Sequence, residues 1–222
     1  MTVSSPLPGK PTSILFNAVT EPETQRTYVV FGTRRGGTSM VAGAVRALGL
    51  DLGNVGGRRN NEDPQFQNHS MDDMRGAIER RNAKRDVWGW KFPAAASYLP
   101  ALFSSIRNPY FIVVYRDPVA AALSQANKDQ RARQRTPRIA LHECNSNVNT
   151  NTGFILATDR PCLLVSHERA IADTGVLIDE LADFLTLERP GDSLRSRMLD
   201  YLAPGHYKSF SDFFAGEDNK PS

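Results

Sequence analysis

The sequence predicts an α/β fold in which helices flank a central, mostly parallel sheet. Two observations carry this prediction. Short runs of β-branched and aromatic residues recur along the chain, and each is followed by a segment whose apolar residues have helical spacing. This alternation is typical of parallel sheets, and a chain of 222 residues has the length of one such domain. Ligands of these sheets bind beyond the carboxyl ends of the strands, so the residues that follow each strand are the candidates for a functional site.

The predicted elements follow one another along the chain. Short apolar runs bounded by turn residues are expected to be strands at 27–31, 87–91, 110–115 and 162–166. Helical spacing predicts helices at 40–48, 66–85, 98–107, 138–157 and 175–187, and a further helix from 117 to about 134. Residues 51–65, rich in Gly and Asn, are expected to form a loop. We expect a flexible lead at 1–12, a single α/β domain at 13–204 and a loosely ordered tail at 205–222.

The composition is that of an ordinary globular protein, with 40% hydrophobic and 23% charged residues. It excludes collagen-like, disulfide-scaffold and wholly disordered chains. The net charge of +3 hides an asymmetry, because residues 26–138 carry 19 Lys and Arg against 9 Asp and Glu, whereas the rest of the chain carries 8 against 15. A basic part with acidic flanks indicates that this part of the fold binds an anionic ligand.

Targeting and redox signals are few. No apolar run approaches the roughly 20 residues that cross a bilayer, and the first residues lack the apolar core of a secretory signal, so no transmembrane segment is expected. Cys144 and Cys162 are too few for a disulfide framework and are expected to be small buried thiols. The expected compartment is the cytoplasm. The histidines show no metal-ligand spacing, and no metal is expected.

A Gly-rich turn, GTRRGGTS at 32–39, follows the first predicted strand. It has the spacing of a phosphate-binding loop, except that Thr38 occupies the lysine position. Glycines let backbone N–H groups turn toward an anion, and the following helix directs its positive end to the same place. The missing lysine normally reaches the β- and γ-phosphates of a nucleoside triphosphate, so the turn suits an anion but is poorly built for ATP. A plain tight turn between strand and helix is the alternative.

A second candidate segment follows the strand at 110–115. Arg116 ends this strand, and Asp117 with Pro118 makes a good helix start, because Asp caps helices and Pro fits their first turn. Ser124 lies about two turns into that helix. The planar donor fork of an arginine suits a phosphate. The alternative is an arginine at a strand end that pairs with a nearby carboxylate.

The two segments together resemble the PAPS-dependent sulfotransferases, and two further stretches resemble bacterial members of that family. The family motif R-[SG]-G-T-[ST] reads here as RGGTS at 35–39, and R-[DN]-P-x-x-x-x-x-S reads as Arg116, Asp117, Pro118 and Ser124. EDPQF at 62–66 is similar to an acidic E-[ND]-x-x-F segment, and WGWKFP at 88–93 to a W-x-x-K-[DF]-P strand end. LLVSHERAI is similar to a late family segment, with His167 where Tyr is usual. The order matches over roughly 27–187.

This resemblance implies a P-loop-like three-layer sandwich and a donor, 3′-phosphoadenosine 5′-phosphosulfate (PAPS), used without a metal. It implies that the Gly-rich turn cradles the 5′-phosphosulfate and that Arg116 and Ser124 bind the 3′-phosphate. The donor-binding residues that it implies in the turn are Arg34, Arg35, Gly36, Gly37, Thr38 and Ser39. Because PAPS has no γ-phosphate, the missing loop lysine agrees with this donor.

Sulfuryl transfer is expected to resemble phosphoryl transfer, with an in-line transition state stabilised by positioning and fixed charge. Arg35 and Lys91 are the candidate catalytic cations. Glu62 is the first candidate for the base that takes the acceptor's proton, because its loop lies between the two donor-binding segments in the sequence. A solvated loop acid or a helix cap is the alternative for Glu62. His69 is the second candidate base, and a surface residue is its alternative.

The expected acceptor is a hydroxyl or amine of a polar small molecule, carbohydrate or glycolipid headgroup, because the variable segments at 51–86 and 130–158 are rich in Asn, Arg and Gln. The basic residues form no recognisable nucleic-acid motif, so nucleic acid is not an expected partner. Two alternatives stay open. One is a non-catalytic nucleotide-binding module of the same fold. The other is a kinase-like phosphotransferase, although the loop lysine is missing and Arg116 stands where a magnesium-binding Asp would follow the strand.

Overall fold

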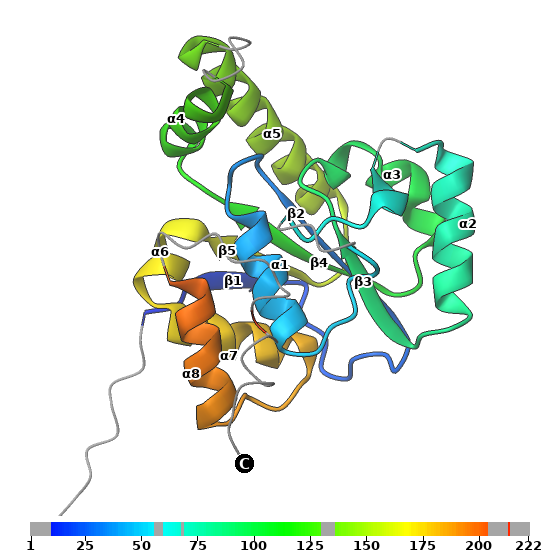
Figure 1. Ribbon diagram of the computed structural model, residues 1–222. Coiled ribbons are helices and arrows are strands. Elements are labelled where there is room, and N and C mark those ends of the chain that lie inside the picture. The colour runs from blue at the N-terminus through cyan, green and yellow to red at the C-terminus, as the bar shows by residue number, and fades with distance from the viewer. Residues whose placement is uncertain (1–9, 56–59, 68, 130–135, 204–212, 214–222) are drawn as a thin grey trace, which may run out of the picture.

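The structure is a computed structural model that describes residues 10–55, 60–67, 69–129, 136–203 and 213 (Figure 1). In this part of the chain, strands form a single five-stranded sheet in the order β1-β5-β4-β2-β3. The strands are β1 (Ser13–Phe16), β2 (Arg26–Gly32), β3 (Val87–Lys91), β4 (Pro109–Tyr115) and β5 (Cys162–Ser166). The predicted α/β fold with a mostly parallel sheet flanked by helices is confirmed.

The pairing of the strands brings the predicted site segments to one edge. β2 pairs in parallel with both β3 and β4, and β4 pairs in parallel with β5. Only β1, among the described strands, runs antiparallel, against β5. The residues that follow β2, β3, β4 and β5 therefore all lie at the same edge of the sheet, which is where α/β sheets bind ligands.

Helices cover both faces of the sheet (Figure 1). One apolar core joins the sheet to the helices α1 (Thr38–Ala47), α7 (Thr174–Leu185) and α8 (Asp192–Leu202). The opposite core joins it to α2 (Met71–Asn82), α3 (Leu99–Leu102) and α5 (Pro137–Ala157). α4 (Pro118–Asp129) packs mainly on α5, and the short α6 (His167–Ala172) follows β5. The result is three layers, with β2 buried along its whole length in the middle one.

Some elements differ from those that the sequence predicts. The helix expected at 98–107 has only one α-helical turn, α3, followed by a 3-10 turn at Phe103–Ser105, because the chain must become extended before Pro109 begins β4. α2 starts at Met71 rather than 66, since the Ser70 hydroxyl accepts the N–H of Asp73 and caps the helix there. β1, α6 and α8 were not expected.

Residues just outside the expected domain, in the expected lead and tail, contact its core. Thr12, in the expected lead, is buried, and both its N–H and its hydroxyl donate to Glu180 on α7. Of the expected tail only Phe213 is described, and its buried ring packs against Tyr201. Both cysteines are buried free thiols, as predicted. Among the described residues, no helix has the length and apolar character needed to cross a membrane.

Candidate functional site

The Gly-rich turn forms a concave loop between the end of β2 and the start of α1. The N–H of Gly36 closes it by donating to the carbonyl of Thr33 at 2.8 Å. Arg35 and Gly37 both have left-handed backbones, with φ of 60° and 88°. Because α1 begins at Thr38, the N–H groups of Thr38 and Ser39 have no acceptor within the helix and lie at the positive end of its dipole. The turn therefore has the local geometry of an anion-binding loop.

Arg116 and Ser124 both reach this turn, although they lie about 80 residues away in sequence. Arg116, directly after β4, donates from Nη1 to the carbonyl oxygen of Arg35 at 2.8 Å. The Arg35 Nε in turn donates to Ser124 Oγ on α4 at 3.3 Å. α4 is oriented by Asp117, whose carboxylate accepts the N–H of Ala120. The structure thus brings together the predicted donor-binding residues from two separate segments.

The guanidinium of Arg116 has spare donors. Its partner in the structure is the Arg35 carbonyl rather than a carboxylate, and its buried Nε makes no hydrogen bond within the described part of the chain. An unpaired buried N–H is costly, and this one lies next to the Gly-rich turn, where a ligand could accept from it. Of the other turn residues assigned from the sequence, Thr38 and Gly36 are buried, whereas the side chain of Arg34 is exposed.

His167 also contacts the turn, which the sequence did not predict. A Cβ atom on Gly37 would lie 2.3 Å from His167 Nδ1, so only a glycine leaves room for this imidazole. The buried Nδ1 makes no hydrogen bond within the described residues. Burial lowers the pKa of His167, and the positive charge of Arg116 lowers it further, while Glu168 opposes both. The neutral form of this imidazole, which lies against the turn, is therefore favoured. Two features of the sequence pointed to it, its place directly after a strand and its position in the segment that resembles a late family motif.

Lys91 and Glu62 form a buried ion pair next to the first turn of α1. Lys91 ends β3, and its side chain is 1% exposed. Its Nζ donates to Glu62 Oε1 at 2.6 Å, to the Asn60 carbonyl at 3.0 Å and to Ser39 Oγ at 3.3 Å. Burial lowers the pKa of Lys91, and the facing carboxylate of Glu62 opposes this shift. The two residues predicted as cation and base are thus in direct contact, beside the Gly-rich turn.

Aromatic packing fixes the loop that carries Glu62. The buried ring of Phe66 stacks on Trp90, with 4.4 Å between the ring centroids. Trp90 immediately precedes Lys91, so the same two segments are joined by an apolar contact and by an ion pair. The second carboxylate oxygen of Glu62 accepts from Gln67 Nε2 at 2.7 Å. The Glu62 side chain is therefore held at both oxygens.

His69, the second candidate base, lies in a different environment. It is exposed and lines a polar hollow of about 360 Å³ together with α2 residues such as Asp72 and Arg80. Among the described residues, no hydrogen bond joins it to Glu62 or Lys91. The geometry therefore favours Glu62 over His69 as the group next to the turn.

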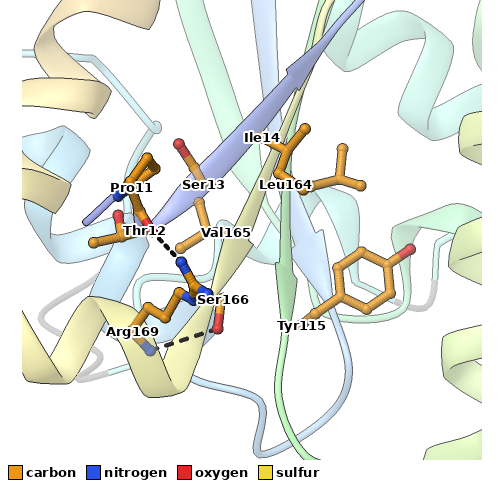
Figure 2. Close-up of a pocket in the computed structure, with 9 residues that line it drawn as sticks. All are labelled: Pro11, Thr12, Ser13, Ile14, Tyr115, Leu164, Val165, Ser166 and Arg169. Atoms are coloured by element: carbon orange, nitrogen blue, oxygen red, sulfur yellow. Dashed lines mark hydrogen bonds between the residues drawn. The ribbon is translucent and has the colours of Figure 1, made fainter.

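A larger, mostly apolar hollow of about 570 Å³ lies beside the ends of β4 and β5 (Figure 2). Ile14, Leu164 and the Tyr115 ring line one side of it. Across it, Arg169 donates from its guanidinium to the Pro11 carbonyl and from its N–H to the Ser166 hydroxyl (Figure 2). Tyr115 and Ser166 immediately precede Arg116 and His167, so the hollow adjoins the residues around the Gly-rich turn. In the described ranges, no group of His, Cys, Asp and Glu is arranged to hold a metal ion.

Comparisons with known proteins bear on the fold. No protein-family model matches the sequence, and no curated protein matches it. A sulfotransferase from Alicyclobacillus acidocaldarius matches the structure with a TM-score of 0.53, over 92% of this chain and 98% of that one, at 11% identity. A sulfotransferase from Mycobacterium avium matches with a TM-score of 0.52, over 88% of this chain and 76% of that one, at 11% identity. The fold is that of the sulfotransferases.

A third solved structure has a lower score. Retinol dehydratase, in complex with androsterone and the inactive cofactor PAP, matches with a TM-score of 0.48, over 86% of this chain and 76% of that one, at 16% identity. At these identities the two matches with TM-scores above 0.5 show the fold alone, and the function of the site is argued from its own residues.

Proposed function

We propose that the protein is a PAPS-dependent sulfotransferase that transfers a sulfuryl group to a hydroxyl or amine of a polar acceptor. The observation that carries this proposal is the convergence of Arg35, Arg116 and Ser124 on the Gly-rich turn. Two guanidinium groups and a hydroxyl beside a helix amino end form a site for a ligand with more than one anionic group. The sulfotransferase fold supports the same function.

The residues around the turn fit the donor. The Gly-rich turn, with the first N–H groups of α1, would hold the 5′-phosphosulfate. Arg116, with its unpaired Nε, and Ser124 would hold the 3′-phosphate. Thr38, at the position of a phosphate-loop lysine, is buried rather than directed outward. This suits a donor without a γ-phosphate, and it argues against the kinase-like alternative.

The proposed transfer is an in-line displacement. The acceptor oxygen or nitrogen forms a bond to sulfur while the bond from sulfur to the 5′-phosphate oxygen breaks, and the electron pair leaves with the phosphate. Arg35 and Lys91 stabilise the charge that develops on the transferred group and the leaving oxygen. Glu62 takes the acceptor's proton, because each of its oxygens has a second lone pair free beyond the bonds to Lys91 and Gln67.

Donor binding is tested by calorimetry with 3′-phosphoadenosine 5′-phosphate (PAP). We expect saturable binding without magnesium, and ATP with magnesium is the control for a kinase-like site. Absence of PAP binding at millimolar concentration contradicts the donor assignment, and tight binding of magnesium–ATP favours the alternative.

Turnover is tested with labelled PAPS and a panel of alcohols, phenols, sugars, glycolipids and amines. Transfer of label to any of these supports an enzyme. If the protein binds PAP but transfers label from PAPS to no acceptor in the panel, the result favours a non-catalytic nucleotide-binding module. The acceptor that gives the highest kcat/KM then defines the substrate class.

A further inference from the structure

Asn61 has an unusual backbone for a buried residue. Its φ is 56°, in the left-handed region, and its side chain is fully buried. Asparagine tolerates this conformation better than most residues, but a buried amide needs hydrogen-bond partners. A strained backbone and a buried polar side chain in one residue suggest that its conformation serves a purpose in the site.

The bend at Asn61 directs both neighbouring residues to the same atom. The Asn60 carbonyl lies 3.0 Å from Lys91 Nζ, and the Glu62 carboxylate lies 2.6 Å from it. In an extended chain the group at 60 and the side chain at 62 would be spread along the strand. The left-handed residue between them folds the chain so that both meet one ammonium group.

The side chain of Asn61 fastens this bend to α1. Its Nδ2 donates to the Ser39 carbonyl at 3.2 Å, and its Oδ1 accepts from Arg46 Nη1 at 3.5 Å. Ser39 lies in the first turn of α1 and Arg46 in the last. The amide therefore joins the segment around Glu62 to the helix whose amino end forms the Gly-rich turn.

From this geometry we propose that Asn61 is a positioning residue, which sets Glu62 and Lys91 relative to the donor loop without touching the reacting atoms. The inference rests on the proposed sulfotransferase function. Without the Asn61 amide, among the described residues only the Ser39 hydroxyl, which donates to the Asn60 carbonyl at 3.2 Å, still joins the segment from Asn60 to Glu62 to α1. With this weaker attachment both charged groups shift relative to the bound donor. Rate, rather than donor affinity, depends on that alignment.

Two variants and a matched control test the role. Asn61→Gly keeps the left-handed backbone at no steric cost and removes the amide. Asn61→Asp keeps the size but presents a carboxylate oxygen where Nδ2 donates to the Ser39 carbonyl. The control is Asn17→Gly. Asn17 also has a left-handed backbone, with φ of 53°, and its Nδ2 donates to the carbonyls of Thr158 and Arg160, at 3.1 Å each.

The measurements are PAP affinity by calorimetry and kcat and KM with labelled PAPS. The acceptor is the best one from the panel, or water if the panel yields none. We expect both Asn61 variants to lose between about tenfold and a hundredfold in kcat. We expect their PAP affinity and donor KM to stay within about twofold of the wild type, and Asn17→Gly to leave kcat within about twofold.

The outcomes separate this inference from the proposed function. An active wild type with Asn61→Gly unchanged in kcat overturns the positioning role. An equal loss of kcat in Asn17→Gly also overturns it, because the effect would then be one of general stability. A loss confined to PAP affinity assigns Asn61 to donor binding instead. A wild type that neither binds PAP nor consumes PAPS overturns the proposed function itself.

Discussion

β4 carries an arginine beside each of its ends, and the two arginines differ in their surroundings. Arg107, near the amino end, donates through its Nη atoms to the carbonyls of Asn82, Arg85 and Asp86. Arg116, after the carboxyl end, donates to the single carbonyl of Arg35. Both are half-buried, and in both Nε makes no hydrogen bond within the described residues.

The two arginines differ in how many of their hydrogen-bond donors remain for a ligand. The Nη atoms of Arg107 join three backbone carbonyls and hold the segments before β3 and β4 together. Arg116, as far as the described residues go, keeps most of its donors unused next to the Gly-rich turn. Arg107 is thus structural at one edge of the sheet, and Arg116 is a ligand-binding candidate at the other. The unpaired Nε alone does not distinguish the two arginines, because both have one. The comparison can be tested at both edges.

The largest expected effect is on turnover at the carboxyl edge. Glu62→Gln should lower kcat by at least about a hundredfold, because the proposed base can no longer take a proton. PAP binding should persist, since the amide oxygen still accepts from Lys91. The measurement is single-turnover kinetics with labelled PAPS.

Its control lies at the amino edge, where Glu23 accepts from the Tyr110 hydroxyl at 2.7 Å. Glu23→Gln should leave kcat unchanged. Full activity in Glu62→Gln would show that His69 or water, rather than Glu62, takes the acceptor's proton.

The next effect is on donor affinity. Arg116→Ala should weaken PAP binding by about 2 kcal/mol, as expected for a lost hydrogen bond to a charged group. Arg107→Ala should lower the melting temperature, because three carbonyls each lose a hydrogen bond, and should leave PAP affinity as it was. Calorimetry and thermal melts of both variants give the comparison. Equal losses of affinity would show that the two edges do not differ as proposed.

The smallest expected effect is a pH dependence of stability. Burial, with the charge of Arg116, lowers the pKa of His167 below that of the unfolded chain. As the pH falls below about 6.5, the unfolded state therefore binds a proton more readily than the folded state. The contribution of His167 to the free energy of unfolding is fully present above that pH. It is lost as the pH falls through the lower pKa of the folded state.

This dependence is measured as the melting temperature between pH 7.5 and pH 5. His167→Gln should flatten the curve relative to the wild type. His142→Gln is the control, because His142 is exposed on α5 and should leave the curve as it was. An unchanged slope in His167→Gln would mean that the acid sensitivity lies in other groups.

The features that could be predicted from the sequence are those that a local pattern of residues encodes. The strands β2 to β5 are apolar runs buried in the middle of the fold, so composition alone indicated them. The Gly-rich turn and Arg116 come at the ends of two such strands, Lys91 is the last residue of a third, and parallel pairing brings these strand ends to one edge. Their proximity could therefore be expected before any distance was known.

The rest depends on contacts between distant segments. β1 is an edge strand of four residues whose side chains are largely exposed. Its apolar run, Ile14 to Phe16, is only three residues long, and the strand pairs with β5 some 150 residues later. Two contacts of the site join segments that are distant in sequence and meet at the carboxyl ends of the strands. They are the packing of the His167 imidazole against Gly37 and the ion pair of Glu62 with Lys91. No spacing in the sequence specifies the backbone twist at Asn61.

Because Lys91 and Glu62 form a buried ion pair, we expect the evolution of one position to depend on the other. Removing one partner leaves a charge without compensation in a nearly dry site, which costs about 3–5 kcal/mol, whereas replacing both with apolar residues of similar volume is often neutral. Substitution at either position should therefore show strong epistasis with the other. A descendant relieved of catalysis could exchange both residues together for an apolar pair, but a stepwise route passes through a poorly folding intermediate.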